Sequence, residues 1–395
     1  MSLIEVSVDH LRCLRHAELA LAPGRNLIYG ENGSGKTSLL EALYLLGRGR
    51  SFRTRNSEKL ITHGERQLVV FGRLQSGLGE EHPHSAPLVS PAASVSGVQD
   101  GMGLVSAGSP LSAQKPGGVT SARALGLQVV RGEATVAKVD GRFVQSLAEL
   151  SQALPVQVIE PGVHKLVEEG AFRRRRWLDW AVFHVEQGFM ETWSHYARAL
   201  RQRNSALRRD AAQVRAWEPE LIRLGELLSD SRRRLIERLV PHWAPMALAL
   251  TGLELELIYS QGWPRDQSLP EALEACRDRD ALRGQTHAGP HRADVLIRRG
   301  GRLARESLSR GQQKLLAVSL ILAQLVLLQE LLPDAPLLLL DDPAAELDPS
   351  RLAVFIEQVA RLDCQLVLTS LSPDMSSFGR PERVFHVEQG GVRQV

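Results

Sequence analysis

One stretch of the sequence decides the fold, and it reads Gly30-Glu31-Asn32-Gly33-Ser34-Gly35-Lys36-Thr37-Ser38, with the pattern G-x-x-x-x-G-K-T. A short apolar run precedes it, and leucines at helical spacing follow it. The glycines permit a backbone path that turns amide hydrogens toward phosphate oxygens, and the helix start adds a positive dipole end. Lys36 can reach the β- and γ-phosphate oxygens, and the hydroxyl of Thr37 can bind Mg²⁺. The stretch therefore predicts that the chain binds ATP or GTP.

Length and composition limit the classes of protein that the chain can be. Its 395 residues, 43% of them hydrophobic, leave room for one large domain with an insertion or for two to three domains. The three cysteines lie far apart in the sequence, which argues against a disulfide framework or a zinc site and favours a reducing compartment. The longest apolar run, residues 315–332, is interrupted by Gln324, Gln329 and Glu330, so we interpret it as a buried helix. We therefore expect a cytoplasmic protein that does not enter a membrane.

The order of strand and helix patterns indicates an α/β protein with an inserted helical arm. Residues 1–171 and 251–395 carry the strand patterns, so we expect them to form the two halves of one nucleotide-binding head. Residues 172–250 are charged and helical in pattern, and we expect them to form the arm. Residues 76–121 are rich in Gly, Ser, Pro, Ala and His, which predicts a disordered insertion between two strands of the head.

The arm and the loop after the first helix are rich in arginine. Residues 47–55 form a basic loop, which we interpret either as a solvated turn or as a contact to DNA or nucleotide. Arginines 173–176 and 232–234 are expected to lie mostly on solvated helix faces, with contact to DNA phosphates as the alternative. Three prolines are expected to break the arm into several antiparallel helices: Pro219, Pro241 and Pro245.

A second group of motifs lies nearer the C-terminus. Residues 307–314 include Ser309, Gly311 and Gln312, and a serine and a glycine at a helix start can form a further anion site. The apolar run that ends at Leu340 is typical of a fully buried strand, and it delivers Asp341 and Asp342 at its carboxyl end. We expect Asp341 to hold the Mg²⁺ shell and Asp342 to polarise the attacking water. The candidate catalytic residues are therefore Lys36 and Asp342.

Together these motifs resemble those of the ABC-type ATPases. The four matching motifs look like a Walker A motif, an L-S-G-G-Q signature, a Walker B motif and a D-loop, and they lie at Gly30–Thr37, Leu308–Gln312, Leu337–Asp342 and Glu346–Asp348. More narrowly, the chain resembles the RecF family of recombination and repair proteins along nearly its whole length apart from residues 76–121. The stretches that carry this resemblance are Gly30–Thr37, Leu39–Leu45, Ser51-Phe52-Arg53, Arg174–Trp180, Thr286–Asp294, Ser309–Leu315 and Leu339–Asp348.

The resemblance implies a fold, a set of partners and a mechanism. It implies an ABC-type P-loop ATPase head with an inserted helical arm, in which the two heads of a homodimer enclose two ATP molecules with Mg²⁺. Ser309, Gly311 and Gln312 would then contact the γ-phosphate that the other head holds. It further implies binding of double-stranded DNA and of junctions with single-stranded gaps, assistance to RecA loading with RecO and RecR, and weak, DNA-stimulated ATP hydrolysis.

Three departures from the transporter ATPases predict slow hydrolysis. Asp342 stands where those proteins usually carry a glutamate, one methylene longer. Thr369 and Ser370 stand where they carry a switch histidine. A clear Q-loop glutamine is missing, and we take Glu160 as its substitute and as a third candidate metal ligand.

Two other functions stay open at this point. The chain could be a transporter ATPase subunit, although the helical arm and the absent switch histidine weigh against it. It could also be a scaffold that holds ATP without hydrolysing it, although the intact Lys36 and Asp341 weigh against that reading.

Overall fold

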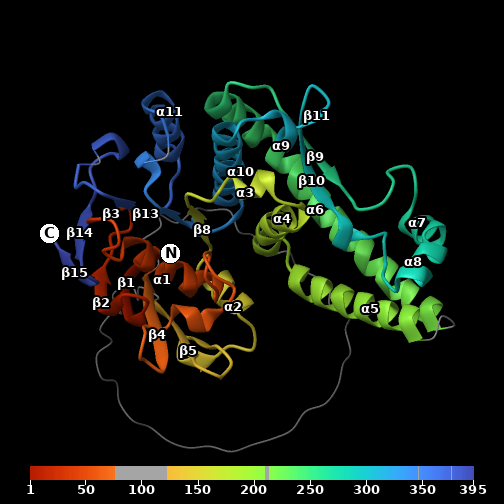
Figure 1. Cartoon of the computed structure of the whole chain (residues 1–395), viewed down its shortest axis with the longest axis horizontal. Coiled ribbons are helices and arrows are strands. Elements are labelled where there is room, and N and C mark those ends of the chain that lie inside the picture. The colour runs from red at the N-terminus through yellow and green to blue at the C-terminus, as the bar shows by residue number, and fades with distance from the viewer. Residues whose placement is uncertain (76–121, 210–212, 346, 375) are drawn as a thin grey trace, which may run out of the picture.

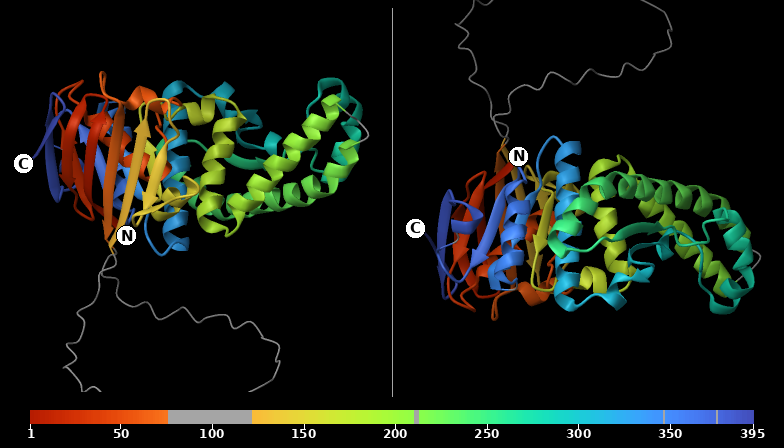
Figure 2. Two further views of the ribbon diagram at one scale, coloured as in Figure 1. Left: turned by 90° about the horizontal axis from the view of Figure 1, so that it is seen from below. Right: turned by 90° about the horizontal axis from the view of Figure 1, so that it is seen from above.

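The computed structural model describes residues 1–75, 122–209, 213–345, 347–374 and 376–395. A head, which holds both termini, and an arm that extends from it can be followed in Figures 1 and 2. The insertion predicted at residues 76–121 lies outside the described residues. The strands on either side of it pair directly, because Gln75 lies opposite Ala122.

A mainly parallel sheet forms the centre of the head, with the strand order β15-β14-β3-β13-β12-β8. Its strands are β3 (Arg25–Tyr29), β8 (Val156–Ile159), β12 (Leu337–Leu340), β13 (Leu366–Ser370), β14 (Arg383–Glu388) and β15 (Gly391–Gln394). All four leucines of β12 are buried, as expected for a strand that is covered on both faces. Because β3, β13, β12 and β8 run parallel, the residues that follow them gather at one edge of the sheet.

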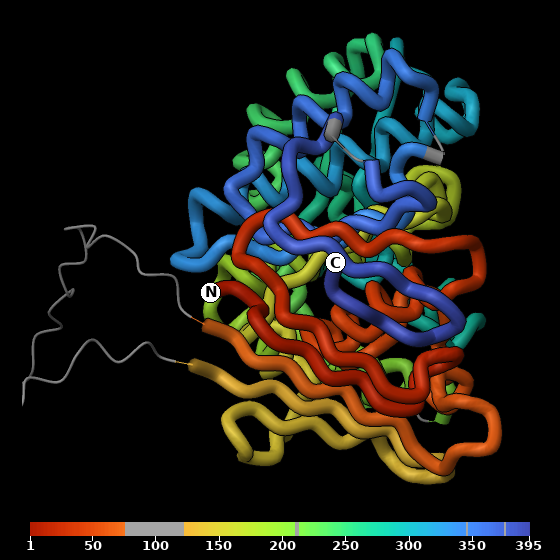
Figure 3. Tube along the Cα trace, turned by 90° about the vertical axis from the view of Figure 1, so that its left-hand side faces the viewer, coloured from red at the N-terminus to blue at the C-terminus, as the bar shows by residue number. Residues whose placement is uncertain are grey.

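An antiparallel sheet forms the outer layer of the head, with the strand order β2-β1-β4-β5-β6-β7. Its strands are β1 (Ser2–Leu11), β2 (Leu14–Ala20), β4 (Gln67–Gln75), β5 (Ala122–Val130), β6 (Val136–Val139) and β7 (Arg142–Phe143). Figure 3 shows β1, β4 and β5 side by side in red, orange and yellow. Leu68, Val70 and Leu74 alternate with exposed or half-buried residues along β4, so this sheet turns one apolar face inward.

Helix α1 (Lys36–Arg48) fills the space between the two sheets. Its residues Leu39 and Leu43 belong to one core cluster with Val367 of the parallel sheet and Leu74 of the antiparallel sheet. The phosphate-binding motif therefore leads into a helix that is buried on nearly every side.

Helices α6 (Val214–Thr251), α10 (Arg310–Leu331) and α11 (Pro349–Ala360) pack in the core cluster on the other face of the parallel sheet. Leu338 of β12 and Leu316 of α10 belong to that cluster. Among the described residues, α10 is the one helix long and apolar enough to cross a membrane, yet 78% of its apolar window is buried inside the protein. The interpretation of this run as a buried helix is confirmed.

The arm is built on α4 (Ala171–Val185), α5 (Phe189–Arg209) and α6, with α5 and α6 packed side by side. The prediction that prolines break the arm into short pieces was wrong, because α6 is a single helix of 38 residues that contains all three prolines. Pro219, Pro241 and Pro245 each lie on its exposed face. The carbonyl groups that lose a helical partner there belong to exposed residues and can bond to water instead, while the opposite face stays buried in the core.

A small third sheet, β11-β10-β9, follows α6 in the sequence. The remaining elements are β9 (Glu256–Ser260), β10 (Asp294–Arg299), β11 (Arg302–Leu303), α2 (Ala148–Ala153), α3 (Lys165–Glu168), α7 (Leu269–Ala275), α8 (Arg277–Arg283) and α9 (Ala304–Ser307). The sequence assigned residues 251–395 to the head as one block, but β9 and β10 pack against α6 and α4. Each of these strands buries alternate residues, so each has one apolar face and suits a position beside helices, outside the central sheet.

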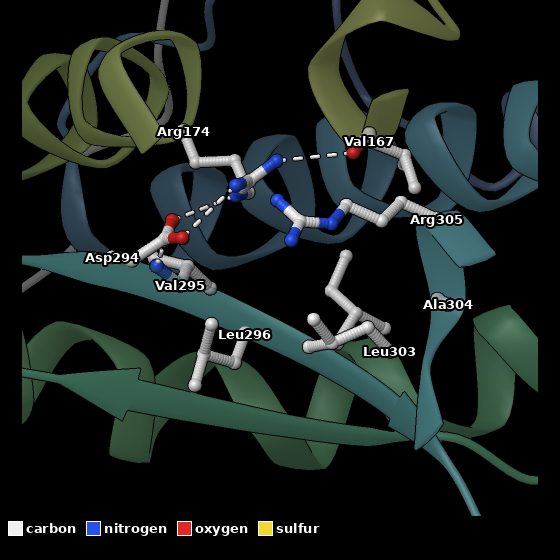
Figure 4. Close-up of a pocket in the computed structure, with 9 residues that line it drawn as sticks. Val167, Arg174, Asp294, Val295, Leu296, Leu303, Ala304 and Arg305 are labelled. Carbon is white, nitrogen blue, oxygen red and sulfur yellow. Dashed lines mark hydrogen bonds and ion pairs between the residues drawn. The ribbon is translucent and has the colours of Figure 1, made fainter. Parts of the chain in front are cut away.

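A buried ion pair ties α4 to this third sheet (Figure 4). The Nε and Nη2 atoms of Arg174 donate to the two carboxylate oxygens of Asp294 at 2.7 and 2.9 Å. Its Nη1 atom donates to the carbonyl oxygens of Leu166, Val167 and Glu169. Since each nitrogen of this buried guanidinium has a partner, Arg174 holds the junction together and is not placed to contact a ligand.

Candidate nucleotide-binding site

The loop between β3 and α1 has the geometry of a phosphate cradle. Gly33 and Gly35 adopt φ values of 81° and 120°, which side chains with a Cβ rarely reach. A Cβ on Gly30 would lie 2.2 Å from the carbonyl oxygen of Val387 in β14, so only glycine fits there. Gly35 is the N-cap of α1 and offers no side-chain oxygen to the first amides of the helix. Those N–H groups are therefore available to an anion.

Lys36 is folded back over this loop. Its Nζ atom donates to the carbonyl oxygens of Gly30 and Glu31 at 2.7 and 2.8 Å. Burial lowers the pKa of Lys36, and the charges of Asp342 and Asp341 act in the opposite direction. Within the described residues, the hydrogen-bond partners of this buried ammonium group are carbonyl oxygens, which phosphate oxygens can replace.

The other predicted loop residues divide into two groups. Glu31 and Asn32 are exposed, and the carbonyl oxygen of Glu31 also accepts from the backbone N–H of Ser34 at 3.3 Å. Ser34 and Ser38 are buried, and the Oγ atom of Ser34 has no hydrogen-bond partner within the described residues. An orphaned hydroxyl inside the cradle is what a loop that closes on a polyphosphate would present.

Two strands bring the predicted metal ligands together. The hydroxyl of Thr37 at the start of α1 donates to the two carboxylate oxygens of Asp341, at 3.0 and 3.1 Å. Asp341 follows β12 directly and is buried. A hydroxyl and one carboxylate are a typical protein contribution to Mg²⁺ sites that are completed by substrate phosphates and water. The parts of the chain that the structure describes contain no cluster of three or more His, Cys, Asp or Glu residues able to hold a metal by themselves.

Thr369 at the end of β13 joins the two aspartates. Its hydroxyl donates to Oδ1 of Asp341 at 3.0 Å and accepts from the backbone N–H of Asp342 at 2.9 Å. Asp342 has a φ of 46°, an unfavourable backbone conformation for a residue with a Cβ, and Thr369 helps to hold it there. The sequence marked Thr369 only as the residue in place of a histidine. Its link to both carboxylates depends on the pairing of β12 with β13, which no local pattern encodes.

Glu160 follows β8 at the same edge of the sheet. The backbone N–H of Asp341 donates to the carbonyl oxygen of Ile159, so the two carboxylates leave neighbouring strands. Burial raises the pKa of Glu160, and the charge of Asp341 raises it further, while Lys165 and Arg173 oppose the shift. The charge of Asp341 acts on the Glu160 carboxyl, and the assignment of Glu160 to the Q-loop position stays a prediction. None of the hydrogen bonds within the described residues joins Glu160 to Thr37 or Asp341.

The signature residues lie at the start of α10, apart from this cradle. Ser309 is the N-cap, and its hydroxyl and backbone exchange hydrogen bonds with Gln312 in a capping box. Gly311 is exposed, and a Cβ placed there would meet nothing within 4 Å. In the described part of the chain, no hydrogen bond joins Ser309, Gly311 or Gln312 to the phosphate loop. The structure therefore brings the phosphate loop and the paired aspartates together, but it leaves the signature open to the surface.

The fold and the site define a class of protein: an ABC-type P-loop ATPase head. The RecF/RecN/SMC N terminal domain family matches residues 2–96 and 114–393 of the chain. A solved structure of an Smc head bound to the C-winged helix domain of ScpA has the same fold, with a TM-score of 0.54 at 14% identity over 100% of this chain and 97% of that chain. The expected fold class is confirmed.

Similarity over the full length narrows this class to one family. The DNA replication and repair protein RecF of Stutzerimonas stutzeri (strain A1501) is 35% identical over 403 residues, which cover 100% of this chain and 98% of that protein. A solved structure of the recombination mediator protein RecF with ATP, in the RecFOR pathway, has a TM-score of 0.81 at 24% identity and covers 100% of this chain and 97% of that chain. The chain belongs to the RecF family of DNA replication and repair proteins, and the resemblance seen in the sequence is confirmed.

Proposed function

We propose that this protein is an ATP-dependent DNA-binding protein of recombinational repair, which dimerises when ATP binds. One observation carries the proposal: the chain has a well-formed phosphate cradle and a signature at the exposed, capped start of α10, and no hydrogen bond among the described residues joins the two. Two such chains can complete each other's sites if the signature of one meets the phosphates held by the other. Ser309, Gly311 and Gln312 would then act on the partner's γ-phosphate.

In this proposal the residues of the cradle divide the work of ATP binding. Lys36 exchanges the carbonyl oxygens of Gly30 and Glu31 for β- and γ-phosphate oxygens. Thr37 and Asp341 would hold Mg²⁺, and Glu160 follows the neighbouring strand at the same edge of the sheet. When bound, the ion neutralises charge on the phosphate oxygens.

The same geometry favours slow hydrolysis. Asp342 orients the attacking water as the general base, with a side chain that is one methylene shorter than glutamate. Thr369 fixes the backbone of Asp342 and the carboxylate of Asp341, but a hydroxyl cannot supply the charge of a switch histidine. A long-lived ATP state suits a protein that uses ATP to stay assembled on DNA.

Membership of the RecF family supports the partners. We propose that the dimer binds double-stranded DNA and junctions with single-stranded gaps, and that it assists RecA loading together with RecO and RecR. We propose a cytoplasmic location, because the protein has to reach DNA and these partners there. The arginine-rich loop at residues 47–55 and the first turns of α4 supply basic residues for such contacts.

Two measurements on the unmodified protein test the proposal. Light scattering should show a dimer with ATP and Mg²⁺ and a monomer without nucleotide. Turnover should be slow and should rise when duplex DNA is added. The proposal is wrong if the protein stays monomeric with ATP and Mg²⁺, or if duplex DNA does not change its rate of ATP hydrolysis.

A further inference from the structure

One heptapeptide, Val-Phe-His-Val-Glu-Gln-Gly, occurs twice in the chain, at residues 182–188 and again at 384–390. Seven residues allow far more sequences than a chain of 395 residues has pairs of positions, so chance does not explain the repeat. The first copy forms the end of α4 and the turn after it, and the second forms most of β14 and the turn after it. These elements lie in separate parts of the molecule (Figure 1). An identical sequence in a helix and in a strand therefore needs another cause.

The structure gives the two copies no common role. Val182 is buried in the first copy, whereas the corresponding Val384 is half-buried in the second. The order is reversed at the next position, because Phe183 is half-buried and Phe385 is buried. The buried members, Val182 and Phe385, belong to different core clusters. Selection on the protein at two such different places would not keep the same side chains.

The two histidines of the repeat fit the protein poorly. His184 packs against the ring of Trp180, and His386 packs against the ring of Tyr29. Within the described residues, the buried Nε2 atom of His184 and the buried Nδ1 atom of His386 have no hydrogen-bond partner. Burial and the charge of Arg48 lower the pKa of His184 to about 3, so this ring stays neutral near neutral pH. A buried nitrogen without a partner destabilises a fold, so stability does not explain why both positions carry histidine.

The seventh residue is different, because the structure explains both of its glycines. Gly188 and Gly390 have φ values of 77° and 80°, in the left-handed region that favours glycine. A Cβ on Gly390 would also lie 2.2 Å from the carbonyl oxygen of Cys13. The identity that the protein does not explain is therefore confined to the six residues Val-Phe-His-Val-Glu-Gln.

The genetic code relates these six residues to one another. The codons GTG for Val and CAC for His are reverse complements, and so are TTC for Phe and GAA for Glu. Reading outward from the centre of the six residues, His stands opposite Val, and Phe stands opposite Glu. The outer Val and Gln can add two further complementary bases on each side. The six residues can therefore be encoded by codons that contain TGTTCCACGTGGAACA, in which each half is the reverse complement of the other.

We propose that the gene carries this palindrome at both copies, and that each palindrome is a binding site for a dimeric, sequence-specific DNA-binding protein. A palindrome presents the same base edges to each subunit of a two-fold symmetric dimer. Its sixteen base pairs have room for two half-sites whose centres lie one helical turn, about 10 base pairs, apart. The repeat in the protein is then the translation of two DNA sites. This inference goes beyond the proposed function and does not depend on it.

The codons of the gene test the first half of the proposal. We expect residues 182–187 and 384–389 to be encoded with the palindrome complete in each copy. Valine has four codons and each of the other residues has two, so the protein sequence alone would seldom select these codons twice. The codons for Glu186 and Glu388 are the clearest check, because both must be GAA whichever codon the other glutamates use. A base that breaks the symmetry in either copy would overturn the inference.

A footprint in living cells tests the second half. Dimethyl sulfate methylates the N7 atom of guanine in the major groove, where a bound protein blocks it. We expect the guanines of both sites to be protected, symmetrically about the centre of each palindrome. Synonymous recoding of both stretches changes the DNA but no residue of the protein, and it should abolish the protection. Guanines that are unprotected in the unchanged gene would contradict a DNA-binding partner.

Variants of the full-length protein test whether the repeat acts in the protein itself. His184→Phe/His386→Phe keeps both rings and removes the nitrogens without partners, so turnover, dimerisation with ATP and the melting temperature should not fall. The control is His291→Phe, because the ring nitrogens of His291 contact the hydroxyl of Tyr196 at 2.7 Å and the carbonyl oxygen of Thr286 at 2.9 Å. We expect the control to lower the melting temperature by about 5 °C. Lost turnover or lost dimerisation in a folded double variant would give the repeat a role in the protein and overturn the inference.

Discussion

The two halves of the candidate nucleotide site differ in how they are held. On the phosphate-loop side, Thr37, Asp341 and Thr369 are tied together by hydrogen bonds that link α1, β12 and β13. On the signature side, the side chains of Ser309 and Gln312 bond to each other's backbone in the capping box, and Gly311 faces open space. Within the described residues, hydrogen bonds between separate elements hold the first half, while the second half is held by its own capping box. Variants on the two sides should therefore fail in different ways.

The largest effect is expected on the rigid side. Lys36→Ala removes the charge that meets the phosphates, and Asp341→Asn removes the carboxylate that holds Mg²⁺ and accepts from Thr37 and Thr369. We expect turnover to fall by about a hundredfold or more in either variant, because such groups act on charge inside a buried site. ATP binding and ATP-induced dimerisation should be lost with it, measured with a fluorescent nucleotide and by light scattering.

An exposed lysine elsewhere in the head provides the control. Lys59→Ala removes the same charge from an exposed position outside the cradle and should leave turnover and dimerisation unchanged. Dimerisation with ATP in Lys36→Ala or Asp341→Asn would show that the cradle is not the nucleotide site.

A variant on the signature side should separate binding from assembly. Ser309→Arg places a bulky side chain at the exposed start of α10, so the chain should bind ATP normally but fail to dimerise and fail to hydrolyse. The substitution also removes an N-cap, which costs about 1 kcal/mol of stability. Ser309→Ala loses the same cap without the bulk, and it should retain most of the dimer. If Ser309→Arg loses ATP binding as severely as Lys36→Ala, then the signature acts within its own chain. The two halves of the site would then not differ in the way described above.

Substitutions of Thr369 test what holds the phosphate-loop side of the site together. We expect them to lower turnover less than the Lys36 and Asp341 variants do. Thr369→Val keeps the shape of the side chain but removes the hydroxyl that accepts from the backbone N–H of the half-buried Asp342. We expect turnover to fall about tenfold with ATP affinity nearly unchanged, and the free energy of unfolding to fall by about 1–3 kcal/mol. Thr369→Ser restores the hydroxyl and should recover most of both. Equal turnover in the valine and serine variants would mean that Thr369 does not position the aspartates.

Local chemistry explains what the sequence could predict. The glycines and Lys36 of the phosphate loop, the four leucines of β12 and the aspartates after them each depend on a pattern a few residues long. The structure joins them as the sequence suggests, because parallel strands bring their carboxyl ends to one edge. The contact between Thr37 and Asp341 spans 304 positions, yet it follows from two local motifs and this one rule.

Long-range packing explains what the sequence could not predict. Pro219, Pro241 and Pro245 read as helix breakers because the pattern does not reveal that all three would face water. The heptapeptide V-F-H-V-E-Q-G makes the same point, since it occurs at residues 182–188 and again at 384–390. The first copy ends α4, and the second forms most of β14 beside β3. The surroundings, not these seven residues, decide between helix and strand.

The smallest effect is expected from the insertion between β4 and β5. We predict that replacing residues 76–121 with a short Gly/Ser turn leaves turnover unchanged and the melting temperature within about 2 °C, because the segment is poor in apolar residues that a core requires. Gln75 and Ala122 lie opposite each other, so a short turn can join them without moving either strand. The control removes paired residues as well: deleting 72–75 with 122–125 takes Leu74 and Leu125 out of the core and should lower the melting temperature clearly. A comparable drop for the first replacement would show that residues 76–121 pack on the head. The segment would then be part of the packed head on the phosphate-loop side of the site, in contrast to the exposed signature.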